Sequence, residues 1–314
     1  MRLRRSLSDA SQSKFPSVIT LGNFDGIHRG HQSLISQTVN HAKAHGLRSV
    51  MLTFDPMPSE FFSPERCPAR LMRFQEKWQC LQSFAPDELY ILPFNQKLAQ
   101  MSAIDFIEQV LVQQLNVKQI FIGDDFRFGS ERKGNVALLR QCGEKFGYSV
   151  TTHTEHEQDQ PISSTRVRNA ILEGDFKLAG NLLGRPYINS GRVVHGSQLG
   201  RELGCRTANI PMRRRVSPVH GVYVVKANFM SQVKYGVASV GSRPAIGGDP
   251  AFLLEVHLFD FSGDLYGKRL EVEYLHKLRD ERMFNSLNTL KVQIAKDCQM
   301  AREKVKFIEM ASSK

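Results

Sequence analysis

Three glycines and two histidines fill one short turn near the start of the chain. The turn reads Gly22-Asn23-Phe-Asp-Gly26-Ile-His28-Arg-Gly30-His31. Glycine lets a bulky anion approach the backbone and permits positive φ angles. His28 and His31 are three residues apart, so at the start of a helix both side chains can donate hydrogen bonds on one side. The free N–H groups and the dipole of such a helix attract anions. The pattern therefore favours a phosphate-binding turn.

Two other interpretations of this turn stay open. Glycine-rich turns between strands and helices are common in α/β proteins that bind no phosphate there. His28 and His31 could also supply half of a zinc site, but no third histidine or cysteine lies close in sequence. The turn is neither a Gly-x-Gly-x-x-Gly motif nor a Walker A motif, because no Gly-Lys-Ser/Thr follows.

A second group of polar residues, Ile162-Ser-Ser164-Thr165-Arg-Val-Arg168, opens another predicted helix. One hydroxyl is a natural N-cap, and capping alone would explain the cluster. Hydroxyls and an arginine at a helix N-terminus also suit a phosphate group. Together with the histidine turn, the cluster favours the phosphate-binding interpretation.

A third segment contains Gly196, Gly200 and Gly204, followed by Thr207 and Asn209. Glycines four residues apart do not form a helix pattern, and they predict a flexible loop that closes over a ligand. Thr207 and Asn209 supply side-chain oxygens of the kind that Mg²⁺ prefers. The pair alone is a weak signal, and the preceding glycines strengthen it.

Apolar and amphipathic stretches alternate in the first half of the chain, as a parallel sheet requires. Beyond residues 184–186 the pattern changes to strands alone, as in a small antiparallel barrel, and ends in a helix whose apolar stripe packs on that barrel. The fold class is α/β plus β, with two domains over residues 1–183 and 184–314. The predicted strands cover 17–21, 49–53, 88–92, 119–123, 148–152, 191–195, 221–229, 234–240, 253–261 and 270–278; the predicted helices cover 32–45, 73–83, 102–115, 136–146, 175–183 and the tail from 287.

Composition limits the class of protein. The 314 residues carry a net charge of +11, and five cysteines are scattered without a Cys-x-x-Cys pair. An odd, dispersed set of cysteines indicates reduced thiols and a cytoplasmic location. We find no signal peptide and no apolar run long enough to span a membrane. Most of the positive charge lies in residues 184–314, but the basic residues are dispersed and lack interleaved aromatics, which disfavours nucleic acid as the partner.

These motifs together resemble the bifunctional bacterial riboflavin kinase/FMN adenylyltransferase family over nearly the whole chain. The resemblance implies a Rossmann-like nucleotidyltransferase domain followed by a small β-barrel kinase domain. It rests on the histidine turn, on 123–129 and 162–168 in the first half, and on 191–196, 200–204, 207–209, 221–223 and 254–256 in the second. Riboflavin, FMN, FAD and ATP are then the expected ligands, with Mg²⁺ as cofactor.

The resemblance also implies residue roles. Glu255 occupies the position of the kinase's general base, Thr207 and Asn209 hold Mg²⁺ and phosphates, and Gly196, Gly200 and Gly204 form the nucleotide loop. In the adenylyltransferase, Gly22, Asn23 and Gly26 shape the phosphate cradle and His28 and His31 steady the triphosphate. Ser164, Thr165 and Arg168 hold the departing pyrophosphate, and Asp125 meets the flavin side.

The chain departs from the family pattern in three places: Met57 stands where a histidine is usual, Asp125 where asparagine is frequent, and Cys205-Arg206 where Phe-Pro is usual. An alternative function is therefore a flavin- or nucleotide-binding protein that retains only the adenylyltransferase activity. RNA binding by the basic half is a second alternative. The sequence leaves self-association open.

Overall fold

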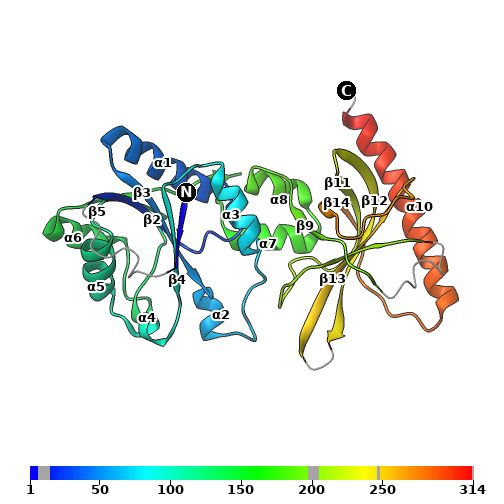
Figure 1. Ribbon diagram of the computed structural model, residues 1–314, viewed down its shortest axis with the longest axis horizontal. Helices are drawn as coiled ribbons and strands as arrows, with labels where there is room; N and C mark the ends of the chain where they lie inside the picture. The colour runs from blue at the N-terminus through cyan, green and yellow to red at the C-terminus, as the bar shows by residue number, and fades with distance from the viewer. Residues whose placement is uncertain (6–14, 197–204, 246–247, 313–314) are drawn as a thin grey trace. The chain divides into compact units, whose positions relative to one another are not determined.

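The computed structural model describes residues 1–5, 15–196, 205–245 and 248–312 (Figure 1). The chain divides into two compact units. The first comprises residues 1–68 and 72–164, and the second comprises residues 69–71 and 165–314. Each unit has its own sheet. Among the described residues no helix is both long and apolar enough to cross a membrane.

The first unit contains a parallel sheet of six strands in the order β1-β4-β3-β2-β5-β6. The strands run Arg2–Arg4, Ser17–Leu21, Arg48–Asp55, Glu88–Pro93, Val117–Ile122 and Ser149–Thr152, from β1 to β6. The chain passes from β2 through β3 to β4 in one direction, then returns to the other side of β2 with β5 and β6. The reversal falls beside β2, and ligands of open α/β sheets bind at the carboxyl ends of strands at such a point.

Helices cover both faces of this sheet, because its central strands are apolar on both sides. On β3, Met51 packs with α1 (Arg29–His45) and α3 (Phe74–Gln82), while its neighbours Val50 and Leu52 pack toward the opposite face. That opposite face is covered by the helical segment 103–114 and by α6 (Val136–Phe146). Residues 106–114 form wider π-type turns, which the amphipathic pattern did not predict.

The second unit contains an antiparallel six-stranded sheet in the order β10-β13-β12-β11-β14-β9. In chain order, β9 to β14 run Ile188–Arg192, Ala208–Pro211, Gly221–Phe229, Gln232–Ala245, Gly248–Leu258 and Arg269–Arg279. The edge strands approach each other just beyond β9, where the Val194 N–H donates to the Asn209 carbonyl over 2.8 Å. This contact nearly closes the sheet into a barrel, as the sequence predicted.

Among the described residues of the second unit, the helices are α7 (Ser164–Glu173, from Thr165 on), α8 (Phe176–Leu183) and α10 (Leu287–Ser312). Phe176 of α8 lies against Tyr223 and Tyr274, with ring centroids 5.7 and 5.5 Å away. Ala301 and Val305 of α10 are buried against β11 and β12, so this part of the predicted apolar stripe is confirmed. Leu287, at the start of the stripe, is exposed.

Several local expectations were wrong. The strand predicted at 191–195 lies three residues earlier, as β9. The predicted flexible loop of the three glycines lies almost wholly outside the described residues; after it, Asn209 lies in strand β10, which was not predicted and pairs with Glu255 of β13. The short strands β1, β7 (His156–Glu157) and β8 (Gln160–Pro161) were not predicted. In the described part of the chain, the smaller helical segments are α2 (Pro58–Phe62), α4 (Gln96–Gln100), α5 (Ala103–Asp105) and a turn at Ser130–Arg132.

Candidate active sites

The histidine turn lies at the carboxyl end of β2, where the strand order reverses. Gly26 has φ 83°, and its neighbours Phe24 and Ile27 also have positive φ, 47° and 41°. This strained turn brings the backbone of residues 22–28 round to the start of α1. The turn is therefore placed where an α/β sheet binds its ligand.

His28 is the N-cap of α1 and adopts an extended backbone conformation. Its Nδ1 accepts a hydrogen bond from the His31 N–H at 3.3 Å. Because Nδ1 is the acceptor, the hydrogen of the neutral His28 ring is on Nε2. The two rings are stacked, with centroids 3.6 Å apart and an interplanar angle of 18°. The structure thus brings the two histidines together as one pair.

His28 is the more buried residue of the pair, but the Nδ1 atom of His31 is buried as well. Burial, together with His28 and Lys77, lowers the pKa of His31 well below its ordinary value, so the ring is neutral at pH 7. Among the described residues, nothing forms a hydrogen bond with its buried Nδ1. A buried polar atom without a partner is costly, and a phosphate oxygen would satisfy it if Nδ1 carries the hydrogen.

Two residues that the sequence analysis missed hold this turn in place. Lys77 of α3 is buried, and its Nζ donates to the Asn23 carbonyl over 2.7 Å. Asp25 is also buried, and its Oδ1 accepts from the Met72 N–H over 3.2 Å. The signal for Lys77 was available: a lysine on the apolar face of a helix, between Phe74 and Leu81, is unusual in a solvated helix.

Ser164 is connected to the same turn, because its Oγ donates to the Asp25 carbonyl over 2.8 Å. Thr165 and Arg168 follow on α7 but belong to the second unit. Arg168 Nε donates to the Ala69 carbonyl over 2.7 Å. The approach of Thr165 and Arg168 to the histidine turn therefore stays a prediction.

Asp125 is exposed in the loop that follows β5. Since β5 lies beside β2 and runs parallel to it, this loop leaves the sheet at the same edge as the histidine turn. Its neighbour Asp124 is engaged instead: hydrogen bonds from Thr152 and Thr154 lower the Asp124 pKa, and Thr154 Oγ lies 2.5 Å from Asp124 Oδ2. The flavin-side role of Asp125 stays a prediction.

The second unit contains a cavity of about 510 Å³, called here the barrel cavity. Four predicted site residues line it, namely Gly196, Thr207, Asn209 and Glu255. Pairing of β10 with β13 sets Asn209 directly opposite Glu255, so residues 46 positions apart share one wall. Gly200 and Gly204 lie outside the described residues.

Asn209 explains why residue 196 is a glycine. A Cβ at position 196 would lie 2.5 Å from Asn209 Nδ2, so a larger residue would displace the amide. Asn209 Nδ2 donates to the Thr207 carbonyl over 3.3 Å. A hydroxyl, an amide oxygen and a carboxylate in one cavity wall are hard oxygen donors, and this donor set fits Mg²⁺.

Aromatic residues complete the barrel cavity, and the sequence analysis did not identify them. Phe261, Tyr266 and Phe284 line it, and Tyr266 stacks on His195 with centroids 3.9 Å apart. They lie in connections rather than in strands, where no periodic pattern distinguishes a ligand contact. They add flat aromatic surface to a wall that carries both polar and aliphatic side chains.

The cavity also has a thiol pair beside it. Cys205 lines the cavity and hydrogen-bonds to Cys298 of α10, which lowers the pKa of the Cys298 thiol. Asp297 is engaged elsewhere, because Arg279 binds its carboxylate through Nε and Nη2 at 2.7–3.1 Å. We expect neither cysteine to take part directly in phosphoryl transfer.

The fold and the two sites fit a two-domain nucleotide-dependent transferase: a parallel-sheet domain with a glycine- and histidine-rich turn at the carboxyl end of β2, and a barrel whose cavity carries hydroxyl, amide and carboxylate groups. Residues 10–166 match the family model for FAD synthetase, and residues 183–305 match the model for riboflavin kinase. The chain belongs to the bifunctional riboflavin kinase/FMN adenylyltransferase family.

Named relatives cover almost the full length. The chain is 44% identical to the bifunctional riboflavin kinase/FMN adenylyltransferase of Haemophilus influenzae, covering 96% of this chain and 98% of the relative. It is 42% identical to the Escherichia coli K12 protein of the same name, over 96% and 97%. A crystal structure described as a macrolide-efflux protein from Streptococcus pneumoniae is 33% identical, with a TM-score of 0.78, over 96% of this chain and 98% of that one.

Proposed function

We propose that this chain carries out both reactions of its family: phosphorylation of riboflavin by ATP to give FMN, and adenylyl transfer from ATP to FMN to give FAD and pyrophosphate. One observation carries the proposal: each of the two family models matches a part of the chain that contains one candidate site. The histidine turn lies in the part that matches FAD synthetase, and the barrel cavity lies in the part that matches riboflavin kinase.

In the barrel cavity, Glu255 is the general base. Its carboxylate accepts the proton of the ribityl hydroxyl as that oxygen attacks the γ-phosphorus of ATP, and ADP leaves. Thr207 and Asn209 hold Mg²⁺, which neutralises phosphate charge when bound. Gly196, Gly200 and Gly204 contribute to the nucleotide site. The aromatic residues on the cavity wall offer surface for the flavin ring.

At the histidine turn, the FMN phosphate attacks the α-phosphorus of a second ATP, so the protein needs no nucleophile of its own. Its work is to position the two reactants and to neutralise charge. Gly22, Asn23 and Gly26 shape the cradle. His28 and His31, as neutral donors, stabilise the developing charge on the triphosphate. Ser164, Thr165 and Arg168 receive the pyrophosphate, and Asp125 contacts the flavin side.

The wider assignments follow from the two reactions. ATP, riboflavin, FMN and FAD are the partners, and Mg²⁺ is the cofactor. A cytoplasmic location is supported by five cysteines that form no disulfide. Self-association stays open. A product analysis tests the proposal: the purified chain with riboflavin and ATP-Mg²⁺ should yield FMN and then FAD by chromatography. A mixture with neither FMN nor FAD would contradict the kinase half, and FMN without FAD would contradict the adenylyltransferase half.

Separating the two units should separate the activities. Residues 184–314 and the longer fragment 165–314 should both phosphorylate riboflavin, and neither should make FAD. The longer fragment should be more stable by about 3–5 kcal/mol, because it keeps Phe176 buried against Tyr223 and Tyr274. Urea unfolding and product chromatography measure both effects. Equal stability of the two fragments would support the boundary after residue 183.

Arg206 should contribute to binding of ATP. Its side chain is exposed and lines the barrel cavity, where a guanidinium can form charge-assisted hydrogen bonds with phosphate. Replacing Arg206 with alanine should raise the KM for ATP about fivefold to tenfold, and added salt should weaken the parent more than the variant. Arg206→Pro separates charge from chain stiffness: a lower KM than the parent would show that pre-organisation dominates. Arg213→Ala, at an exposed arginine outside the cavity lining, is the control.

A further inference from the structure

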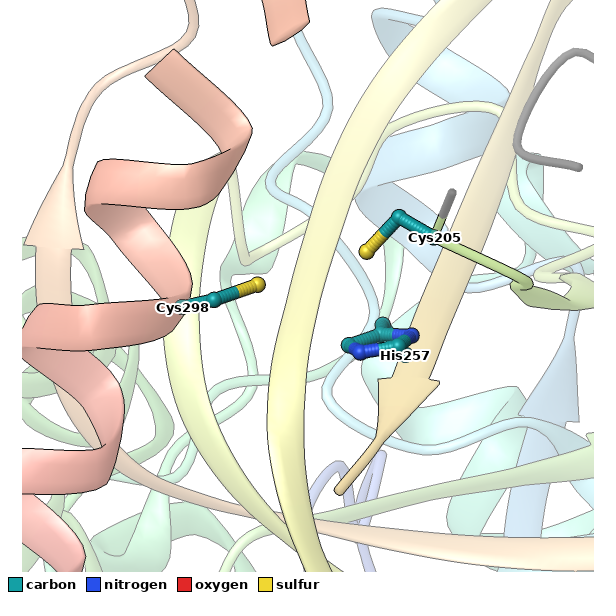
Figure 2. A group of neighbouring side chains, drawn as sticks. All are labelled: Cys205, His257 and Cys298. Carbon is teal, nitrogen blue, oxygen red and sulfur yellow. The ribbon is translucent and has the colours of Figure 1, made fainter. Parts of the chain in front are cut away.

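Three side chains from distant parts of the second unit converge on one another (Figure 2), and two of them, Cys205 and His257, line the barrel cavity. Cys205 precedes β10, His257 lies on β13 and Cys298 lies on α10. One ligand atom from each lies within 4.8 Å of the other two. The two reactions assigned above use none of these side chains. Their convergence therefore needs an explanation of its own.

The donor set has the chemistry of a zinc site. Two thiols and an imidazole are the ligands that Zn²⁺ takes, whereas Mg²⁺ takes oxygen. Zn–S bonds of about 2.3 Å and Zn–N bonds of about 2.0 Å place tetrahedral ligand atoms roughly 3.5–3.8 Å apart. The observed limit of 4.8 Å means that the three atoms need to approach by only about 1 Å. Rotation about the single side-chain χ1 of a cysteine supplies a movement of that size.

A second observation concerns the imidazole. His257 Nδ1 lies 2.9 Å from the Arg206 carbonyl oxygen. A carbonyl can only accept, so Nδ1 carries the hydrogen and Nε2 keeps its lone pair. Metal-binding histidines almost always donate their other ring N–H to a carbonyl or a carboxylate in this way. The tautomer of His257 is thus fixed in the form that binds a metal.

The surroundings leave room for an ion and a fourth ligand. Cys205 and His257 line the barrel cavity, which gives an ion a path to the cluster. Cys205 is buried, while His257 and Cys298 are half-buried. Asp297, next to Cys298, is occupied by Arg279, so it does not complete the site. Three protein ligands and one position open to water are the arrangement expected here.

We propose that Cys205, His257 and Cys298 form a Zn²⁺ site beside the barrel cavity, separate from the Mg²⁺ position at Thr207 and Asn209. The bound ion joins three segments that are far apart in sequence: the residues before β10, strand β13 and helix α10. It thereby holds the start of the Thr207–Asn209 segment against the barrel. The site does not depend on either proposed reaction, because it rests on side chains that neither reaction uses.

The test uses the full-length chain, fully reduced and stripped of metal with a chelator. Zn²⁺ alone, titrated in competition with a chromophoric chelator, should bind at one ion per chain. Co²⁺ in its place should give thiolate-to-metal charge-transfer absorption. Cys298→Ser and Cys205→Ser should each weaken Zn²⁺ binding by more than the roughly 10–100-fold that loss of an outer-shell partner costs. Cys67→Ser, a cysteine outside the cluster, should leave binding unchanged.

Alkylation of the parent protein alone, with and without Zn²⁺, tests the site even if the cysteine variants fail to fold. Zn²⁺ should protect Cys205 and Cys298 from alkylation, read by mass spectrometry of peptides, while Cys67 stays reactive. A reduced parent that binds Zn²⁺ no more tightly than the Cys298→Ser variant overturns the site. So does a Co²⁺ complex without thiolate absorption, or alkylation of Cys205 and Cys298 at the same rate with and without Zn²⁺.

Discussion

Replacing Glu255 with glutamine should slow phosphorylation of riboflavin by about 10²–10⁴-fold, the range that a positioned general base contributes. Glutamine has nearly the same shape but cannot accept the hydroxyl proton. Glu255 pairs with Asn209 on one side and Ser239 on the other, so the backbone of β13 should hold the amide in the same place. Conversion of added FMN to FAD should be unchanged.

The measurement is a pair of assays on one preparation: riboflavin to FMN, and FMN to FAD. Glu271→Gln is the matched control, because Glu271 lies exposed on β14 outside the cavity lining. A Glu255→Gln variant that still phosphorylates riboflavin within tenfold of the parent would exclude Glu255 as the base. Loss of both activities would instead indicate a general folding defect.

The spacing of apolar residues, together with the turn and capping residues that end each run, predicted most of the fold. The strand 17–21, the helix 136–146 and the strand 221–229 have the predicted bounds, because apolar runs there end at clear turn or capping residues. Short strands escaped prediction for a physical reason. β10 is four residues long and is held by pairing with β13, so its conformation depends on a strand more than 40 residues away.

In the candidate sites, too, the sequence predicted which residues lie together, but the contacts that hold them depend on the folded geometry. The spacing of His28 and His31 predicted a pair, but the use of His28 Nδ1 as the helix cap requires the actual turn geometry. Lys77 and Asp25 act through backbone atoms of the turn, and a sequence does not reveal which carbonyl or N–H a side chain reaches. Cysteine spacing gave no sign of the cluster at Cys205, because its partners come from a strand and a helix far along the chain.

The burial of His31 has a consequence for stability. Its folded-state pKa lies well below the unfolded value of 6.5, chiefly because burial disfavours the charged ring. Protonation therefore favours the unfolded chain, so the first unit should lose stability as pH falls through about 6.5 and below. Without the His31 imidazole, this pH-dependent loss of stability is absent. In His31→Ala, the fall in unfolding free energy between pH 7 and pH 5 should be smaller than in the parent.

Substitutions in the histidine pair should reduce FAD formation by about 10²–10³-fold, the usual cost of losing a donor to transition-state charge. His28→Asn is the sharper variant, since asparagine is a good N-cap and keeps α1 started while removing the imidazole Nε2–H. His31→Ala removes the second imidazole, with its buried Nδ1. Phosphorylation of riboflavin should be unchanged in both, and His45→Ala, at the exposed end of the same helix, should match the parent.

If His28→Asn made FAD at the parental rate, the role of His28 would be that of a cap alone. If both variants lost FAD formation only in proportion to their loss of folded protein, measured by unfolding at the assay temperature, the pair would be structural and the phosphate-binding assignment of the turn would fail.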